Sequence, residues 1–473
     1  MFERIIHFWA ALSPDKMAIE TGSAKITYRR FADDIDRMTA SLEGLGLGTR
    51  RLVLISDGRP YIHWLLFFAL ERLGHISASD DVVSRTFDVL RPDVVFSEKD
   101  DHPGKAGRFV HTNAEWVKAA LSRPGTARRT TAAPADPVRI TLSSGTTGVP
   151  KQILFKRSQV DLRIHRNSLA NVPETRMLST MGLDTVGYQT ALTMWTHSGT
   201  MIYGGGLNTA EALTKLDVTY LAMVPIQLQH LLNALPADYR SRPDLRLAVG
   251  GAAMPRRLLD ATRSRLAGNP IIIYGSTEGG PISFGYANSF DGVPGAVGYL
   301  LPWVDLEVVD DQGKPVPSGD IGRLRIDVTG IFDGYRDSLD NSETYKDGWL
   351  YPGDMVSVRE DGLLILAGRD DEVINLGGEK VAVFAVEEML MTNPGVADVA
   401  VFSLPDADGI EVLHAAVVAN PGLDRASLDA TLGTRMRHPV KIVLVDSVPR
   451  NPRGKILRSD LKKDIAARLA ALA

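Results

Sequence analysis

The most informative stretch of this sequence is the ten-residue run Leu142-Ser143-Ser144-Gly145-Thr146-Thr147-Gly148-Val149-Pro150-Lys151. It directly follows the apolar-alternating run Val138-Arg139-Ile140-Thr141. Glycines let a backbone approach an anion closely, hydroxyls and free N–H groups donate to it, and a lysine adds positive charge. The stretch therefore predicts a phosphate-binding loop, although a Ser/Thr/Gly-rich surface loop between strands has the same composition. It is not a Walker loop, because Gly148 is followed by Val149-Pro150-Lys151 where that motif has Gly-Lys-Ser/Thr.

Strand-like and helix-like segments alternate around this loop. Residues 27–45 carry apolar side chains at helical spacing, and Leu52 to Ser56 is a short apolar run typical of a buried strand. A helix is predicted next over 61–73, and the following short strands are predicted at 94–96, 219–225, 245–249 and 271–274. This alternation predicts an α/β protein with a parallel sheet covered on both faces.

The composition changes near Gly292, beyond which glycine and proline turns separate short alternating runs. These runs predict a small antiparallel, β-barrel-like region. The C-terminal part returns to strands and helices, and a closing helix is predicted from Ser459. Because 473 residues are too many for one core, we expect a large N-terminal domain of stacked α/β sheets over residues 1–370 and a small α+β domain over 371–473.

Composition also limits the function. The chain has no cysteine, which excludes disulfides, thiolate metal sites and a cysteine nucleophile, and its ten histidines form no pair at the spacing of zinc ligands. A net charge of −4 argues against a nucleic-acid partner. The longest apolar run, Trp64 to Leu70, is too short for a membrane span, and Met1 to Leu12 predicts an amphipathic helix rather than a signal peptide. We therefore expect a cytoplasmic enzyme.

Four further stretches, taken together with the phosphate-binding loop, form a recognisable set of motifs. They are Tyr274-Gly275-Ser276-Thr277-Glu278, Gly348-Trp349-Leu350-Tyr351-Pro352-Gly353-Asp354, the run from Gly368 to Val381, and the run from Pro449 to Arg458. In this order and at these separations, the five stretches resemble the adenylate-forming superfamily of acyl-CoA synthetases, adenylation domains and luciferases. The resemblance covers nearly the whole chain and is closest to a compact acyl-CoA synthetase.

The resemblance implies a two-step reaction with ATP and Mg²⁺. A carboxylic acid attacks the α-phosphate of ATP to give an acyl-adenylate and pyrophosphate, and a thiol then displaces AMP to give a thioester. The first step needs charge neutralisation at phosphorus, with little covalent participation by the protein. A nucleotide-binding protein without catalysis is the alternative of a different class, and the carboxylates and lysine retained in the five stretches argue against it.

On the matching positions, the resemblance implies the following nucleotide contacts. The β- and γ-phosphates would be held by Ser143, Ser144, Gly145, Thr146, Thr147, Gly148 and Lys151. Thr277 would bond the α-phosphate and Glu278 would ligate Mg²⁺. The adenosine would be bound by Gly251, Ala252, Tyr274, Gly275, Ser276, Asp354 and Arg369, with Asp354 accepting both ribose hydroxyls. Lys455 would bridge the carboxylate and the α-phosphate.

The resemblance also implies a mobile C-terminal domain. Asp371 matches the hinge about which this domain pivots between the two half-reactions. Gly377, Gly378 and Lys380 would line the path of the thiol, because glycines let a pantetheine arm pass closely. The motif around Lys455 favours CoA as the thiol, and the phosphopantetheine of an acyl carrier protein is the alternative.

The acid is expected to contact Asp184, Tyr188, Met223 and Gly250. Asp184 stands where many acyl-CoA synthetases carry a histidine segment, and it resembles the aspartate of amino-acid-activating adenylation domains. A carboxylate facing a pocket needs a cation or donor, which points to an acid that carries an amino or hydroxyl group. A capping or solvent-facing aspartate is an equal alternative.

Overall fold

The computed structural model forms two compact units. It describes residues 2–79, 89–100, 107–126, 133–143, 151–168, 173–184, 186–336, 344–370, 373–376, 379–406, 410–432, 439–450 and 456–472. Unit 1 contains Met1–Ala222, Thr277–Gly280 and Val328–Gly348. Unit 2 contains Met223–Ser276, Pro281–Asp327 and Trp349–Ala473.

The first sheet of unit 1 has the strand order β6-β5-β3-β4-β7-β8. Its strands are β3 (Leu52–Ser56), β4 (Ile76–Ser79), β5 (Val94–Ser97), β6 (Arg108–His111), β7 (Pro137–Ser143) and β8 (Lys151–Lys156). All neighbours pair in parallel except β7 and β8, which are antiparallel. The side chains of β5 are buried along its whole length, as expected for a strand covered on both faces.

Other strands of this unit are part of a second, larger sheet. It contains β11 (Tyr220–Met223), β9 (Arg176–Leu178), β10 (Thr200–Tyr203), β1 (Met17–Thr21) and β2 (Lys25–Thr27), in that order. The short strand β18 (Tyr345–Lys346) also belongs to unit 1. The helices are α1 (Glu3–Leu12), α2 (Tyr28–Glu43), α3 (Pro60–Arg72), α5 (Ala114–Leu121), α6 (Arg157–Asn167), α7 (Val186–Thr196) and α8 (Thr209–Lys215).

Aromatic side chains fill the space between α2, α3 and α7. The rings of Trp64 and Trp195 meet edge to face with centroids 4.8 Å apart, and Phe31 lies 5.3 Å from Trp195. All three residues are buried. Such aromatic pairs contribute about 0.5–1.5 kcal/mol each beyond the burial of their area. This cluster anchors α7 against α2 and α3.

Unit 2 begins with strands in the order β12-β13-β14-β15-β21-β20-β17-β19, and β16 pairs with β17. The strands are β12 (Arg246–Gly250), β13 (Ile271–Ser276), β14 (Gly280–Tyr286), β15 (Ala296–Leu300), β16 (Leu306–Val309), β17 (Gly322–Asp327), β19 (Trp349–Leu350), β20 (Asp354–Val358) and β21 (Leu363–Arg369). Strands β12 and β13 are parallel, whereas those from β14 to β21 are antiparallel. The helical segments are α9 (Pro225–Ala234), α10 (Arg256–Arg265) and the 3-10 turn η2 (Ala287–Phe290).

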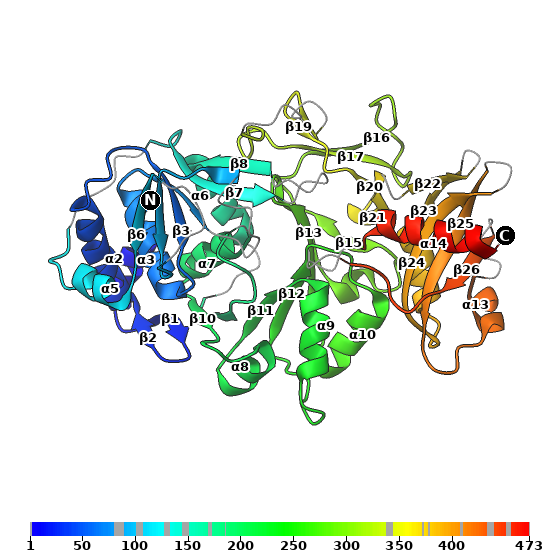
Figure 1. The fold of residues 1–473 in the computed structure, drawn as a ribbon, viewed down its shortest axis with the longest axis horizontal. Helices are drawn as coiled ribbons and strands as arrows, with labels where there is room; N and C mark the ends of the chain where they lie inside the picture. The colour runs from blue at the N-terminus through cyan, green and yellow to red at the C-terminus, as the bar shows by residue number, and fades with distance from the viewer. Residues whose placement is uncertain are drawn as a thin grey trace. The chain divides into compact units, whose positions relative to one another are not determined.

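The C-terminal part of unit 2 forms a hairpin and a three-stranded sheet. The hairpin pairs β22 (Val373–Leu376) with β23 (Glu379–Ala382), and the sheet has the order β24 (Val396–Pro405), β25 (Glu411–Ala419) and β26 (Val440–Leu444). Helices α12 (Val383–Met391), α13 (Arg425–Leu432) and α14 (Arg458–Leu472) accompany it. The red helix α14 packs on β24 (Figure 1), where Leu461 and Ile465 contact Phe402.

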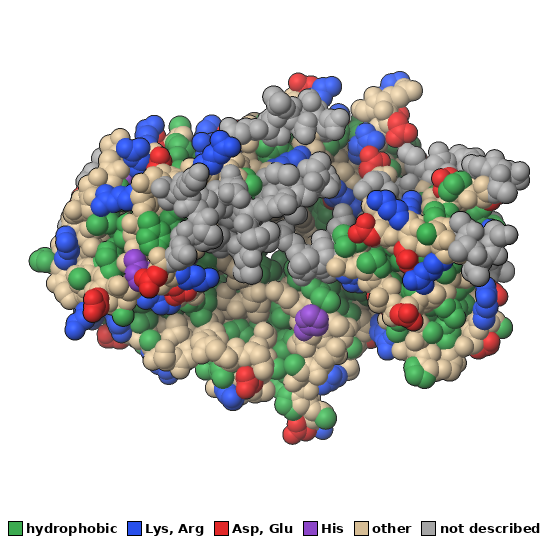
Figure 2. All heavy atoms as spheres, viewed as in Figure 1, with side chains coloured by type: hydrophobic (Ala, Val, Ile, Leu, Met, Phe, Trp, Pro, Cys, Tyr) green, Lys and Arg blue, Asp and Glu red, His purple; other side chains and the backbone are tan. Residues whose placement is uncertain are grey.

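The α/β fold predicted from the sequence is confirmed. Helices predicted over 27–45 and 61–73 are α2 and α3, and the antiparallel region beyond Gly292 is present. The boundary between residues 370 and 371 stays a prediction, because Asp371 lies outside the described residues. Lys, Arg, Asp and Glu side chains are interspersed on the face drawn in Figure 2. Within the described ranges, no helix is both long and apolar enough to cross a membrane.

Candidate functional site

The phosphate loop predicted from the sequence joins two paired strands. Ser143 ends β7 and Lys151 begins β8, and these two residues are partners in the antiparallel ladder. The loop is therefore the connection of a β-hairpin. The following predicted residues lie outside the described residues: Ser144, Gly145, Thr146, Thr147, Gly148, Asp371, Gly377, Gly378 and Lys455. For Ser143 and Lys380, the structure describes the strand position alone.

Three side chains of unit 1 form a chain of contacts. The Lys151 ammonium lies 4.7 Å from the centroid of the Tyr335 ring, and the Tyr335 hydroxyl donates to Glu278 Oε1 at 2.8 Å. Tyr335 therefore holds a cation on its face and a carboxylate at its hydroxyl. A cation over an aromatic face is attracted by about 0.5–2 kcal/mol. This contact positions Lys151 and Glu278 relative to one another. Tyr335 was not predicted from the sequence.

The backbone that carries Glu278 is held by Arg163, which the sequence analysis also missed. Arg163 Nη1 donates to the carbonyl oxygen of Thr277 at 3.0 Å, and Nη2 donates to that of Glu278. The guanidinium lies over the ring of Phe155, with Cζ 4.4 Å from its centroid. Burial lowers the pKa of Arg163 to about 10, so this side chain stays charged at neutral pH.

Glu278 suits a hard divalent cation. Its carboxylate is half-buried, and among the described residues only the Tyr335 hydroxyl bonds it, at Oε1. Mg²⁺ prefers one or two carboxylate oxygens together with phosphate oxygens and water. No group of three or more His, Asp or Glu side chains suited to a metal occurs in the described part of the chain. The donor set thus fits an ion held by one protein carboxylate and by a phosphate substrate.

Unit 2 brings together three predicted nucleotide residues. Tyr274 lies on β13, Asp354 begins β20, and Arg369 ends β21 directly opposite Asp354. The Tyr274 hydroxyl donates to Asp354 Oδ2 at 2.5 Å, and Arg369 Nη1 donates to Oδ1 at 3.1 Å. Arg369 also donates to the Pro352 carbonyl at 2.7 Å. Burial, and then the charge of Asp354, raise the pKa of Tyr274 well above its usual value, so its hydroxyl remains a donor.

The glycines at the end of β12 let two backbone segments approach closely. A Cβ at Gly250 would lie 2.8 Å from the Ile273 carbonyl oxygen on β13. Gly251 has a φ of +81°, which favours glycine, and Ala252 follows it. Gly275 and Ser276 end β13, and Met223 is buried in the strand β11.

The predicted substrate residues of unit 1 lie around a second buried arginine, Arg139 on β7. Arg139 Nη2 donates to the carbonyl oxygens of Leu183 at 2.9 Å and Asp184 at 3.4 Å. Its Cζ lies 4.9 Å from the centroid of the Tyr188 ring, and Tyr188 is only 1% exposed. The half-buried Asp184 carboxylate accepts no hydrogen bond from the residues that the structure describes. Of the substrate residues predicted in unit 1, Asp184 therefore has a carboxylate that could accept a hydrogen bond from the acid.

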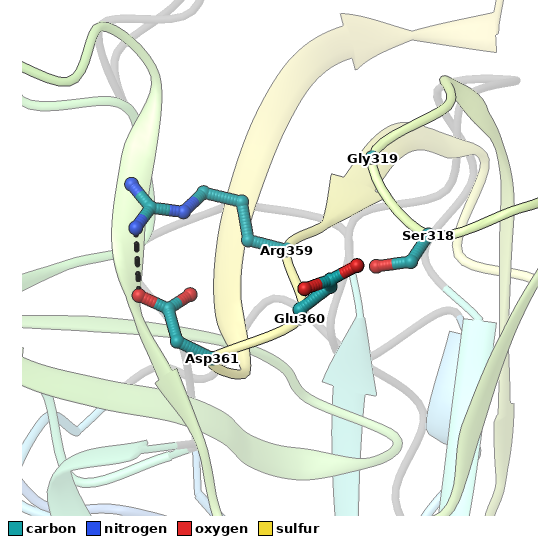
Figure 3. A pocket seen from close by; sticks show the side chains of 5 residues that line it. All are labelled: Ser318, Gly319, Arg359, Glu360 and Asp361. Atoms are coloured by element: carbon teal, nitrogen blue, oxygen red, sulfur yellow. Dashed lines mark hydrogen bonds and ion pairs between the residues drawn. The ribbon is translucent and has the colours of Figure 1, made fainter.

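A pocket elsewhere in unit 2 contains none of the predicted residues. It has a volume of about 370 Å³ and is lined by Ser318, Gly319, Arg359, Glu360 and Asp361 (Figure 3). Arg359 donates to Asp361 at 2.7 Å across the β20–β21 turn. The arginine is thus already paired within the turn.

Comparison with known proteins matches the AMP-binding enzyme family over residues 6–336 and the AMP-binding enzyme C-terminal domain over residues 385–455. A salicylyl-CoA synthase/salicylate adenylyltransferase from Streptomyces is 28% identical over 97% of this chain and 92% of its own length. A fatty acid–[acyl-carrier-protein] ligase from Streptomyces coeruleorubidus is 30% identical over 70% of this chain and 67% of its own length.

Solved structures match over the same extent. The o-succinylbenzoate CoA synthetase of Bacillus subtilis, in complex with ATP and magnesium ion, superposes with a TM-score of 0.81 at 20% identity. The match covers 97% of this chain and 99% of that enzyme. The chain thus belongs to the AMP-binding enzyme family and is an AMP-forming acid–thiol ligase.

Proposed function

We propose that this enzyme activates a carboxylic acid with Mg·ATP and transfers the acyl group to CoA. The observation that carries the proposal is the contact chain of Lys151, Tyr335 and Glu278. It holds together a cation and a carboxylate suited to Mg²⁺, on two of the stretches that the resemblance assigns to the nucleotide. A relative named as a CoA synthase aligns over nearly the whole chain, and a fold neighbour was solved with ATP and magnesium.

The first step forms one bond and breaks one bond at the α-phosphorus. A carboxylate oxygen of the acid attacks phosphorus, and the bond from phosphorus to the bridging oxygen of pyrophosphate breaks. Mg²⁺ held at Glu278 would supply charge neutralisation to the leaving pyrophosphate. Lys151 adds positive charge beside the phosphates, and the Thr277 hydroxyl donates to the α-phosphate.

The residues of unit 2 serve the adenosine in this proposal. Tyr274 presents its ring to the adenine, and Asp354 accepts the ribose hydroxyls while Tyr274 and Arg369 orient its carboxylate. Gly251, Ala252, Gly275 and Ser276 are small residues that would allow close approach of the nucleotide, while Gly250 and Met223 would contact the acid.

The second step needs a change of arrangement. A thiolate sulfur attacks the acyl carbonyl, AMP leaves, and the thiol proton goes to solvent. We propose that residues 371–473 move as a lid about Asp371, so that Lys455 serves adenylation and Gly377, Gly378 and Lys380 serve the thiol. CoA is the preferred thiol. The phosphopantetheine of a carrier protein is the second candidate, because the relative from Streptomyces coeruleorubidus is named as a carrier-protein ligase.

The acid that we favour carries a hydrogen-bond donor near its carboxylate. Asp184 supports this, because its half-buried carboxylate has no hydrogen-bond partner among described side chains and its backbone is held by Arg139. The relative named for salicylate acts on an acid of this kind.

Pyrophosphate release from Mg·ATP tests the proposal. The acids are benzoate, salicylate, anthranilate, indoleacetate and a medium-chain fatty acid, each assayed with and without CoA. We expect release that depends on the acid, with AMP and a CoA thioester formed when CoA is added. A protein that binds ATP but releases no pyrophosphate with any acid would contradict the proposal. If pyrophosphate is released but no CoA thioester forms, and a phosphopantetheinylated carrier protein is acylated instead, the second candidate thiol is favoured.

A further inference from the structure

Arg163 is a buried cation on α6 whose two Nη atoms donate to backbone oxygens, whereas its Nε is buried without a hydrogen-bond partner. Its exposed fraction is 2%, and it donates to the carbonyl oxygens of Thr277 and Glu278 and, at 3.5 Å, to that of Ile331. No carboxylate of the described residues lies within ion-pairing distance of its guanidinium. A buried charge without a counter-ion is costly, so these contacts must account for an arginine here rather than a leucine.

The three carbonyls lie on two segments that are far apart in sequence. Thr277 and Glu278 follow β13, whereas Ile331 lies four residues before Tyr335. Tyr335 in turn binds the Glu278 carboxylate. Glu278 is therefore fixed at both ends: Arg163 holds its carbonyl oxygen, and Tyr335 holds its side chain. An ion ligated by Glu278 would meet a carboxylate whose position is already set.

We propose that Arg163 is a positioning residue that holds Thr277 and Glu278 in the geometry that binds Mg·ATP. This inference rests on the proposed function of those two residues. Without Arg163, two adjacent carbonyls lose charged donors and the segment must be ordered when the nucleotide binds. Removing the partner that orients a metal ligand typically weakens metal affinity or activity by about 10- to 100-fold.

The test is calorimetric titration of the purified full chain with ATP, in Mg²⁺ and in EDTA. For Arg163→Gln we expect the Kd of Mg·ATP to rise about 10- to 100-fold, with a smaller change in EDTA, where Glu278 has no ion to hold. Arg163→Lys keeps a charged donor and should recover part of the affinity. Full wild-type affinity of Arg163→Gln for Mg·ATP would overturn the inference.

A matched control separates positioning from loss of stability. Arg72 on α3 is also buried and donates to Asp36 at 2.5 Å, so Arg72→Gln should lower the Tm while leaving the Kd of Mg·ATP unchanged. An equal rise in Kd in both variants would overturn the inference. If Arg163→Gln does not fold, Tyr335→Phe releases the Glu278 side chain and should produce the same Mg²⁺-dependent loss of affinity. Wild-type affinity of Tyr335→Phe for Mg·ATP would overturn the inference that a prepositioned Glu278 is needed.

Failure of the proposed function gives a different result. Glu278→Gln should remove most of the affinity that Mg²⁺ adds to ATP binding. If it does not, the role of Glu278 in the proposed function fails. If Glu278→Gln loses that affinity and Arg163→Gln keeps it, the role of Arg163 fails alone.

Discussion

Asparagine in place of Asp354 would test how the protein recognises ribose. In the structure, Tyr274 donates to Asp354 Oδ2 and Arg369 donates to Oδ1. Asparagine has the same shape, but its NH₂ group is a donor and cannot accept from either neighbour. Asp354→Asn therefore removes the negative charge and at least one orienting hydrogen bond, while the packing around the side chain stays the same.

The expected magnitude follows from the hydrogen bonds that ribose would make. A hydrogen bond to a charged group contributes about 1.5–3 kcal/mol, and 1.4 kcal/mol corresponds to roughly tenfold in Kd. If Asp354 accepts both hydroxyls, the wild-type protein should prefer ATP to 2′,3′-dideoxy-ATP by roughly a hundredfold or more. In Asp354→Asn this preference should fall to about tenfold or less, since a neutral acceptor makes weaker bonds.

The assay is a Kd measurement for ATP, 2′-deoxy-ATP, 3′-deoxy-ATP and the dideoxy analogue with both proteins. Asp361→Asn is the matched control, because Asp361 lies on the turn between β20 and β21 and pairs with Arg359. It should keep the wild-type preference for ribose. A preference in Asp354→Asn that equals that of the wild type would refute the assignment of Asp354 to the ribose.

Three further outcomes are expected. Arg139→Gln releases the Leu183 carbonyl and should raise the KM for the acid several-fold while the KM for ATP changes little, as measured by pyrophosphate release. Lys455→Ala should abolish adenylation but spare thioester formation from supplied acyl-adenylate, and equal loss of both would contradict its role. Burial, and then Glu3, raise the pKa of Glu71 well above its usual range. Protonated Glu71 therefore contributes to the free energy of unfolding below about pH 4.5. This contribution is lost as the pH rises toward the folded-state pKa, with a slope of about 1.4 kcal/mol per pH unit. Glu71→Gln should therefore flatten the dependence of the unfolding free energy on pH, measured by denaturant titration from pH 5 to 8.

Local patterns were sufficient to predict the elements that carry the site. The alternation of apolar residues predicted β7 up to the phosphate loop, and the run at 271–274 predicted β13 just before Thr277. Both predictions depend on side chains that are neighbours in sequence. The resemblance then singled out Tyr274, Asp354 and Arg369, and the structure brings these three together through the ladder of β20 and β21.

The residues that orient the site could not be found in this way. Arg163 lies 114 positions before Thr277, and its own helix contains other basic residues, such as Arg157 and Arg166, so nothing local marks it as the inward one. Tyr335 follows Gly334 in a segment without periodicity, and its partner Glu278 is 57 positions away. Contacts of this kind depend on how sheets and loops pack, which hydrophobic patterning along one segment does not specify.

The buried arginines of unit 1 connect the stability of this enzyme with its chemistry. Arg139 and Arg163 are both at least 98% buried, and neither has a carboxylate within ion-pairing distance among the described residues. Burial lowers the pKa of each to about 10, so both remain cations at neutral pH. Carbonyl oxygens and aromatic faces disperse this charge without neutralising it. Each arginine therefore acts by holding backbone carbonyls of the candidate site, at Leu183 and Asp184 for Arg139 and at Thr277 and Glu278 for Arg163.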